Sequence, residues 1–378
     1  PDQGHLYYRG YDIYDLAPYH KQKYGYERIC FLILFGHLPN DDELEDFHKY
    51  ISSLYELPNG FIEDHILKSN SSSIMNQMQR AILTLYSYDK NPDDISPEAT
   101  LEKGLNLIAK MPAVMSYSYR AKKHYIDGLS LHIRKPREDY SIAENILHMS
   151  RRHGDFTLLE AETLDLALIL HADHGGGYNS TFTNIVISST GTDIYSSVCG
   201  SLGSLKGPRH GGASKAVNDM MKNVIKEVGL NASDDKIRDV VRRILDGKFN
   251  DNSGLIYGIG HAVYTINDPR AILLKEKCHE LAIMEKEEKR FDFYDRFQRI
   301  AIEELKLRKG KDYCCCTNVD FYSGLTYTIL KINEDLFLPI FACSRLLGWI
   351  AHNIENRLYS DKIIRPAGMY VGDIKKEK

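Results

Sequence analysis

The helical spacing of the apolar residues is the feature that most constrains the fold of this 378-residue chain. After Asn40, a residue type that caps helices well, Leu44, Phe47 and Ile51 recur at intervals of three or four positions. Capping residues precede similar patterns at Ser96, Ser141 and Ser233. Alternating apolar and polar runs, which mark half-buried strands, are scarce. The sequence therefore predicts an all-α protein.

Two segments, residues 166–170 and 336–354, are apolar around most of their circumference. This pattern predicts buried helices rather than surface ones. A chain of 378 residues exceeds the usual size of a single core, so we expect two packed lobes. A charge-rich stretch favours a smaller lobe over residues 213–322, between two parts of a larger lobe at 1–212 and 323–378.

Composition excludes several classes of function. A net charge of -4, with basic and acidic residues interspersed, argues against nucleic-acid binding. No uninterrupted apolar run approaches the ~18 to 20 residues that span a bilayer, so we expect no membrane association. Seven cysteines, three of them adjacent, do not form a spaced disulfide framework. We expect a cytoplasmic protein, with an organellar matrix as the alternative because the sequence begins at Pro1 rather than at Met.

Three short glycine-bearing segments each present one acid or base. They are Lys206-Gly-Pro-Arg-His210-Gly-Gly, Gly258-Ile-Gly-His261-Ala-Val-Tyr and Asn318-Val-Asp320-Phe-Tyr-Ser-Gly. Glycine allows sharp turns and a close approach of backbone to ligand. Two imidazoles and a carboxylate, without a nucleophilic Ser or Cys in an elbow motif, suit proton abstraction next to a carbonyl. Asp320 would be the base, one histidine would hydrogen-bond the developing enolate, and the other would polarise an electrophilic carbonyl.

Three arginines stand in turns or in otherwise apolar surroundings, namely Arg270, Arg345 and Arg365. Guanidinium groups bind carboxylates through two parallel hydrogen bonds, so this set favours a di- or tricarboxylate ligand. The structural alternative is that Arg270 caps a helix and that Arg345 forms a structural ion pair.

Taken in order, these segments resemble those of the citrate synthase family. The resemblance runs from Tyr7-Tyr-Arg-Gly-Tyr-Asp-Ile, through His171-Ala-Asp-His174-Gly-Gly-Gly-Tyr-Asn-Ser-Thr-Phe and the three catalytic segments, to Arg365-Pro-Ala-Gly-Met-Tyr-Val-Gly. It implies an all-α fold with a large and a small domain, and a homodimer that closes on oxaloacetate before acetyl-CoA reacts. It implies no tightly bound cofactor, with acetyl-CoA as a cosubstrate, and no metal.

The resemblance also implies roles for residues that match by position. Asp320 matches the base, and His210 matches the group that stabilises the enol. His261 would polarise the oxaloacetate carbonyl and protonate the new alkoxide. The implied oxaloacetate ligands are His174, Arg270 and Arg345, joined by Arg365 from the neighbouring subunit. The backbone of Gly258, Ile259 and Gly260 would contact CoA, and His171 would support His174.

The chain departs from the family pattern at Ser214, Ile259 and Ala262. Ser214 replaces a more usual Asn, and its shorter side chain puts the support of His210 in question. Ile259 replaces a more usual aromatic residue and could alter packing against CoA. Ala262 stands where many family members carry Arg, though others carry Ala. None of the three changes removes a proton-transfer group.

Three alternatives stay open at this point. A 2-methylcitrate synthase shares the catalytic set and uses propionyl-CoA, and one methylene group distinguishes substrates only weakly. A metal-dependent hydrolase would use His171 and His174, although the glutamate of the His-Glu-x-x-His pattern is absent. The third alternative is an inactive helical scaffold.

Overall fold

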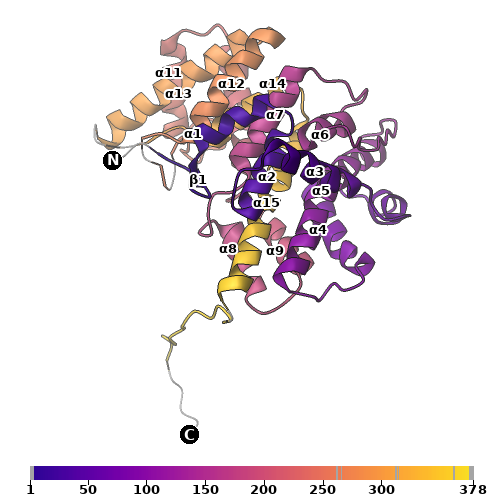
Figure 1. The fold of residues 1–378 in the computed structure, drawn as a ribbon. Helices are drawn as coiled ribbons and strands as arrows, with labels where there is room; N and C mark the ends of the chain where they lie inside the picture. The colour runs from indigo at the N-terminus through magenta and orange to yellow at the C-terminus, as the bar shows by residue number, and fades with distance from the viewer. Residues whose placement is uncertain are drawn as a thin grey trace.

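The computed structural model describes residues 4–260, 263–264, 266–310, 313, 315–360 and 362–373, and its regular structure is almost entirely helical (Figure 1). A single antiparallel pair joins β1 (Tyr7–Tyr8) to β2 (Tyr11–Asp12) in the described part of the chain. The predicted all-α class is confirmed.

The helices follow one another along the chain, and the longest connections are those before α6 and before α12. In chain order they are α1 (Ile13–Leu16), η1 (Ala17–Lys21), α2 (Gly25–Phe35), α3 (Asp41–Ser53), η2 (Ile62–Leu67), α4 (Ile74–Leu85), η3 (Tyr86–Tyr88), α5 (Pro97–Tyr125), α6 (Ile142–Ser150), α7 (Leu158–His171), α8 (Asn179–Ser188), α9 (Ile194–Leu205), α10 (Ala213–Val228), α11 (Asp234–Leu245), α12 (Pro269–Glu285), α13 (Glu288–Lys309), α14 (Val319–Ile329), η4 (Glu334–Leu336) and α15 (Phe337–Tyr359). The predicted caps Asn40, Ser96 and Ser141 accept hydrogen bonds from the first turns of α3, α5 and α6. Ser233 precedes α11, but its side chain makes no capping bond.

Helix α15 lies at the centre of the larger group of helices, where it packs on α5, α7, α8 and α9. Together with η4 it is long and apolar enough to cross a membrane, but 78% of its most apolar window is buried inside the protein. This burial is typical of a core helix. The predicted burial of residues 166–170 and 336–354 is therefore confirmed, except at half-exposed positions such as Leu338 and His352.

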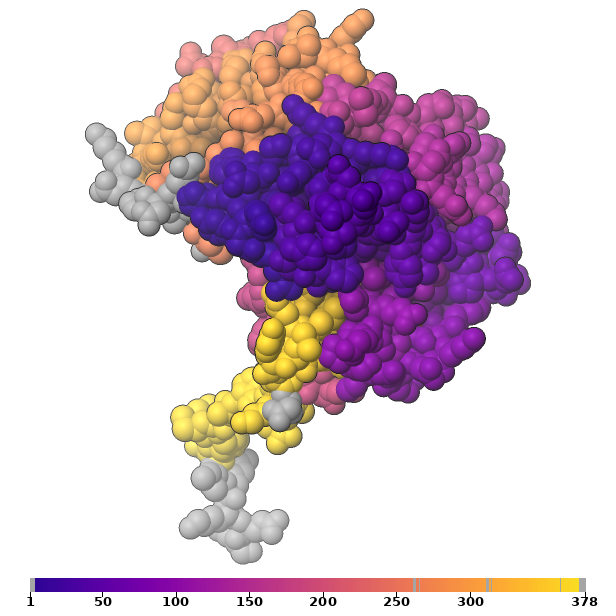
Figure 2. All heavy atoms as spheres, in the orientation of Figure 1, coloured from indigo at the N-terminus to yellow at the C-terminus, as the bar shows by residue number. Residues whose placement is uncertain are grey.

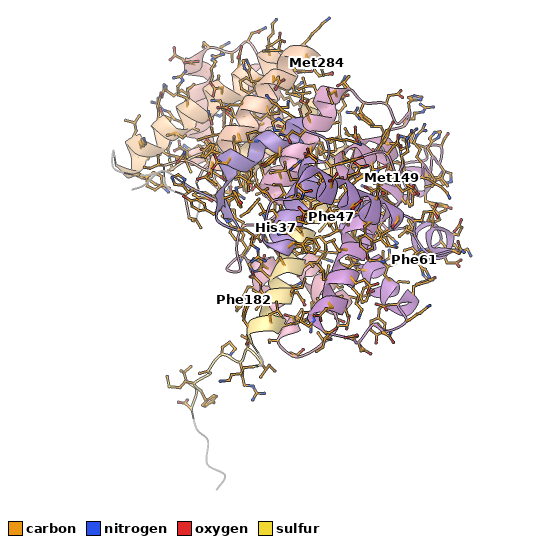
Figure 3. The ribbon with its side chains drawn as sticks, viewed as in Figure 1. His37, Phe47, Phe61, Met149, Phe182 and Met284 are labelled. Carbon is orange, nitrogen blue, oxygen red and sulfur yellow. The ribbon has the colours of Figure 1, made fainter. Side chains whose placement is uncertain are left out.

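Helices α10 to α14 form a second group, at the upper end of Figure 1. Within it α12 packs on α14 and α13, α10 on α14, and α11 on α13, while contacts of α12 with α7 and of α10 with α15 join the group to the rest. In Figure 3, Met284 on α12 lies in this upper group and Phe182 on α8 lies in the lower one. Helix α14 continues without a break through residue 322, so no interruption of the helix marks the predicted boundary there. The lobe boundaries therefore stay a prediction.

A glycine sets the closest approach of α15 to the segment that precedes His174. The Gly348 N–H donates to the Ala172 carbonyl at 3.2 Å, and a Cβ at this position would lie 2.8 Å from that oxygen and 2.5 Å from Asp173 Oδ1. Backbone cannot move aside as a side chain can, so only glycine fits here.

We expect Gly348→Ala to lower the free energy of unfolding by about 1–3 kcal/mol, because the added methyl group overpacks the core against backbone. Urea unfolding followed by circular dichroism measures the change. Gly200→Ala is the matched control, since the new methyl group there meets the end of the flexible Ile187 side chain. Equal stability of the two variants would contradict the packing argument.

Candidate active site

One cavity of about 100 Å³, partly open to solvent, collects most of the residues that the sequence singled out. Its walls come from α7, α10, α12, α14 and α15 and from the loops before α8 and α10. The predicted site residues among its lining are His171, His210, Arg270, Asp320 and Arg345. Residues separated by up to 174 positions are thus brought together between the two groups of helices.

Asp320 is held at the start of α14 by an interlocked pair of turns. Asn318 caps this helix, since its Oδ1 accepts the Asp320 N–H at 3.1 Å. The Asn318 N–H and Nδ2 donate to the carbonyls of Gly258 and Gly260 at 2.9 and 3.1 Å, and the Gly260 N–H donates to the Cys316 carbonyl at 2.7 Å. Two of the predicted catalytic segments are therefore physically one structure.

Gly258 shows why glycine is required in this turn. Its φ is +81°, and a Cβ would lie 2.8 Å from Val217 Cγ2 and 2.9 Å from Phe321 Cβ. Ile259 pairs with Thr317 in an isolated bridge. His261 and Ala262, which follow this turn, lie outside the described residues, so the predicted role of His261 stays a prediction.

The surroundings of Asp320 suit a general base. Burial raises the pKa of the Asp320 carboxyl to about 6, and nearby Asp268 acts in the same direction, while Arg270 and Arg345 oppose the shift. A carboxylate with a pKa near 6 is ionised at neutral pH and is a stronger base than an exposed aspartate.

His210 is oriented by a serine and a tryptophan from two other helices. Its Nε2 lies 2.9 Å from Ser180 Oγ and accepts the Ser180 N–H at 3.3 Å. Ser180 Oγ in turn accepts the indole N–H of Trp349 at 3.3 Å, which leaves its own proton to donate to His210. Because both Ser180 groups donate to Nε2, the proton of neutral His210 belongs on Nδ1. Burial and the nearby Arg345 lower the pKa of His210, so the neutral form dominates.

No hydrogen bond joins Ser214 to His210 among the described residues, although Ser214 lines the cavity. Ser214 stands where the family pattern has Asn, which put the hydrogen-bond support of His210 in question. That support comes instead from Ser180. Ser180 lies in the quoted Asn-Ser-Thr-Phe sequence, but only the packing of α8 against α15 shows what it contacts.

Arg270 is both paired and buried. Its Nε and Nη2 donate to the two carboxylate oxygens of Asp268 at 3.0 and 2.8 Å, and the residue is 3% exposed. Burial alone would lower the pKa of Arg270, but the Asp268 carboxylate more than offsets this and raises it. Asp268 also accepts the N–H groups of Arg270 and Val319 at 3.0 and 3.1 Å. The structural alternative, that Arg270 caps a helix, is wrong, because Asp268 is the cap of α12 and Arg270 is its ion-pair partner, with its guanidinium lining the cavity.

Arg345 lacks such a partner among the described residues. Its Nε donates to the His171 carbonyl at 2.8 Å, its Nη1 has no hydrogen-bond partner there, and the residue is 1% exposed. Burial lowers the pKa of Arg345. A buried cation with an unused donor, beside a second buried cation, favours binding of an anion in the cavity.

His171 and His174 are neutral in this setting. Burial lowers the pKa of His171 to about 3 and that of His174 to about 2, and Arg270 and Arg345 act in the same direction on both rings. His171 Nδ1 bonds to the Ala167 carbonyl at 2.6 Å. The backbone carbonyl of His171 accepts the hydrogen bond from Arg345 Nε, so His171 helps to position Arg345. In the described structure no hydrogen bond joins His171 to His174. His174 lies against the Tyr178 ring, with the centroids 4.4 Å apart.

Arg365 is not brought to this cavity. It is exposed in the segment 362–373, which is hydrogen-bonded to the body through the Ile364 N–H and Ser189 Oγ and then projects away from it in Figure 2. Within the described ranges, no group of three or more His, Cys, Asp or Glu side chains has the arrangement of a metal site.

An all-α scaffold thus holds a buried carboxylate, an oriented imidazole and two buried guanidinium groups around one cavity, a set that suits proton transfer on carboxylate substrates. Residues 1–367 match the family described as citrate synthase, C-terminal domain. The chain belongs to the citrate synthase family, and it is an enzyme of that type.

Individual relatives agree with this assignment. The chain is 36% identical to citrate synthase 2 of Bacillus subtilis over 98% of its own length and 91% of that protein. It is 32% identical to a 2-methylcitrate synthase of Shewanella oneidensis over 97% of its length and 88% of that protein. Its fold matches the citrate synthase of Thermoplasma acidophilum, solved with carboxymethyl coenzyme A and oxaloacetate, with a TM-score of 0.82, 26% identity and coverage of 99% and 92% of the two chains.

We expect Ser180→Ala to lower kcat about 10-fold with little change in the KM for the carboxylate substrate. The loss of one donor to His210 Nε2, worth ~1.4 kcal/mol, weakens the Nδ1–H form of the ring. Steady-state kinetics measure both constants. Thr183→Ala is the control, because it removes a hydroxyl from the same helix that bonds only to the Asn179 carbonyl. Parallel losses in both variants would show a general effect on α8.

We expect the rate to fall on the acid side with an apparent pKa of about 6, the pKa of Asp320. Below this pH the carboxyl is protonated and cannot accept a proton, so kcat/KM should drop about 10-fold per pH unit. The check is kcat/KM from pH 5 to 8 in buffers of constant ionic strength. The residual activity of Asp320→Asn should not show this fall of kcat/KM at low pH. If the variant shows the same fall, the titrating group is not Asp320.

Proposed function

We propose that the protein condenses acetyl-CoA with oxaloacetate and water to give citrate and CoA. The observation that carries this proposal is the meeting of Asp320, with its pKa of about 6, and the oriented His210 at a cavity that holds two buried guanidinium groups. The relatives named as citrate synthases support it.

The first step forms the nucleophile. Asp320 removes a proton from the methyl group of acetyl-CoA, and the electrons of that C–H bond form the enol double bond. His210 donates its Nδ1–H to the thioester oxygen, where the negative charge develops. A donor placed in advance for this oxygen lowers the barrier, because no solvent has to reorganise during the reaction.

The second substrate binds through its carboxylates. Arg270 and Arg345 would hold the two carboxylates of oxaloacetate, and the unused Nη1 of Arg345 offers one of the hydrogen bonds. Neutral His174 lies beside both cations and would add a further contact. His261, at the position that the family assigns to the carbonyl-polarising group, would donate a proton to the alkoxide that forms.

Bond formation and hydrolysis complete the reaction. The enol carbon attacks the keto carbon of oxaloacetate, the thioester carbonyl re-forms as the enol proton returns to His210, and citryl-CoA results. Water then cleaves the thioester, with its hydroxyl joining the citrate carboxyl and its proton passing to the CoA thiolate. Asp320 gives up the one proton that it took from the methyl group, His261 regains the proton that it donated, and the new carboxyl ionises, which releases one proton to solvent. The backbone of Gly258, Ile259 and Gly260, which is tied to the start of α14, would contact CoA. The protein groups supply all proton transfers, so we propose no resident cofactor or metal.

A 2-methylcitrate synthase is the second candidate, because a relative of that name is 32% identical to this chain. It would use propionyl-CoA in the same steps. A comparison of kcat/KM for the two acyl thioesters at saturating oxaloacetate distinguishes the candidates.

The test of the proposed function is the release of CoA, followed with a thiol reagent, when acetyl-CoA and oxaloacetate are both present. Release should depend on oxaloacetate, and citrate should form in equal amount. Asp320→Asn is the control for the assignment of the base, and we expect a loss of ~10²- to 10⁴-fold. CoA release without oxaloacetate would indicate a thioesterase and contradict the proposal.

We also infer a homodimer in which Arg365 completes the partner's carboxylate site. The segment that carries Arg365 exposes Ile363, Met369, Tyr370 and Val371, each at least 50% exposed, and such apolar side chains are typical of a surface that another chain covers. A cytoplasmic location is part of the same proposal and is tested by cell fractionation.

Two inactive variants, Arg365→Ala and Asp320→Asn, should restore activity when combined in mixed dimers. One site of a mixed dimer receives both changes, while the other has an intact Asp320 and an intact Arg365 from its partner. Activity per mixed dimer should approach half of the wild-type value. Differently tagged chains, co-expressed and purified as mixed dimers, allow the measurement. Inactive mixed dimers would place Arg365 outside the partner's site.

A further inference from the structure

Tyr178 is a residue of the cavity to which neither the sequence nor the proposed mechanism gives a role. It follows the glycine run 175–177 and stands directly before the first residue of α8. Its side chain lines the cavity. Because α8 also carries Ser180, the position of the Tyr178 ring is tied to the element that orients His210.

The Tyr178 ring lies beside residues of both proposed substrate sites, although His174 is not among the residues that line the cavity. Its centroid lies 4.4 Å from that of His174 and 6.4 Å from that of His210. The Arg345 guanidinium lies over the ring, 5.8 Å from its centroid. His174 and Arg345 belong to the carboxylate side, and His210 belongs to the thioester side. The ring therefore stands beside the place where the two substrates must meet.

The phenol hydroxyl is poorly suited to proton transfer. Burial raises the pKa of Tyr178, with Asp268 and Asp320 acting in the same direction, so the hydroxyl stays neutral. Its oxygen is 3.5 Å from His174 Nε2, at the limit of a hydrogen bond. Apart from the hydroxyl, the aromatic ring itself lines the cavity.

We propose that the Tyr178 ring limits the acyl group to two carbons and so selects acetyl over propionyl thioesters. The inference rests on the proposed condensation. The attacking carbon must touch Asp320, must carry a thioester within reach of His210, and must face the keto acid held by the arginines. A methyl substituent on that carbon has to enter the space beside these groups, which the Tyr178 ring borders.

The rest of the wall is less suited to this selection. Phe337 is 1% exposed and packs against Tyr327, and Phe341 packs against His171, so these rings belong to the core around α15. Tyr178, by contrast, stands in the loop before α8, and its ring contacts other residues of the site, His174 and Arg345.

The test compares kcat/KM for acetyl-CoA and propionyl-CoA at saturating oxaloacetate. The wild type should favour acetyl-CoA, and Tyr178→Ala should raise the propionyl-to-acetyl ratio by about 10- to 200-fold, the range for one methylene group in a pocket. Tyr178→Phe keeps the ring and should leave the ratio within about twofold. Leu338→Ala, which enlarges the same cavity from α15, is the matched control and should also leave the ratio within about twofold.

Each other outcome has a definite meaning. A wild type that uses both thioesters equally, or an unchanged ratio in Tyr178→Ala, overturns the role of Tyr178 while the condensation stands. An equal shift in Leu338→Ala overturns it as well, since cavity volume in general would then decide. A wild type that condenses neither thioester overturns the proposed function itself. Tyr178→Val replaces the alanine variant if the latter unfolds at the assay temperature.

Discussion

The geometry of the cavity depends on one buried carboxylate, that of Asp268. It pairs with the Arg270 guanidinium through both oxygens and accepts the N–H groups of Arg270 and Val319, so it fixes the first turns of α12 and α14 against each other. A buried charge is tolerated only when it is paired and hydrogen-bonded. This requirement holds Arg270 and the turn that carries Asp320 in a single arrangement.

The same buried charges set the ionisation of the remaining groups. Burial, together with the positive charge of Arg345, lowers the pKa of His171, His174 and His210 and keeps these rings neutral. A neutral ring can donate one hydrogen bond and accept another, and it does not repel the arginines. Burial raises the pKa of Asp320. The buried environment thus shifts the pKa values of these side chains away from their values in water, and the shifts suit some of them to act as acids or bases and others to bind anions.

Local sequence signals account for the helices because they act over a few residues. Asn40 and Ser141 form capping boxes with Glu43 and Glu144, as their spacing indicates. The division into lobes is harder to predict from the sequence, because it depends on which helix faces pack against each other. Helix α14 shows this, since it contributes Asp320 at one end and continues past the predicted boundary at residue 322.

The sequence by itself determined the all-α class, the apolar core segments and the identity of the chemical groups, because periodicity, caps and glycine-bearing motifs are local properties. Only the tertiary structure decided how those groups are supported. The Ser180 and Trp349 bonds that orient His210, the Asp268 contacts and the place of the Tyr178 ring join residues far apart in the chain. Such contacts leave no local pattern, since they arise from the packing of whole helices against one another.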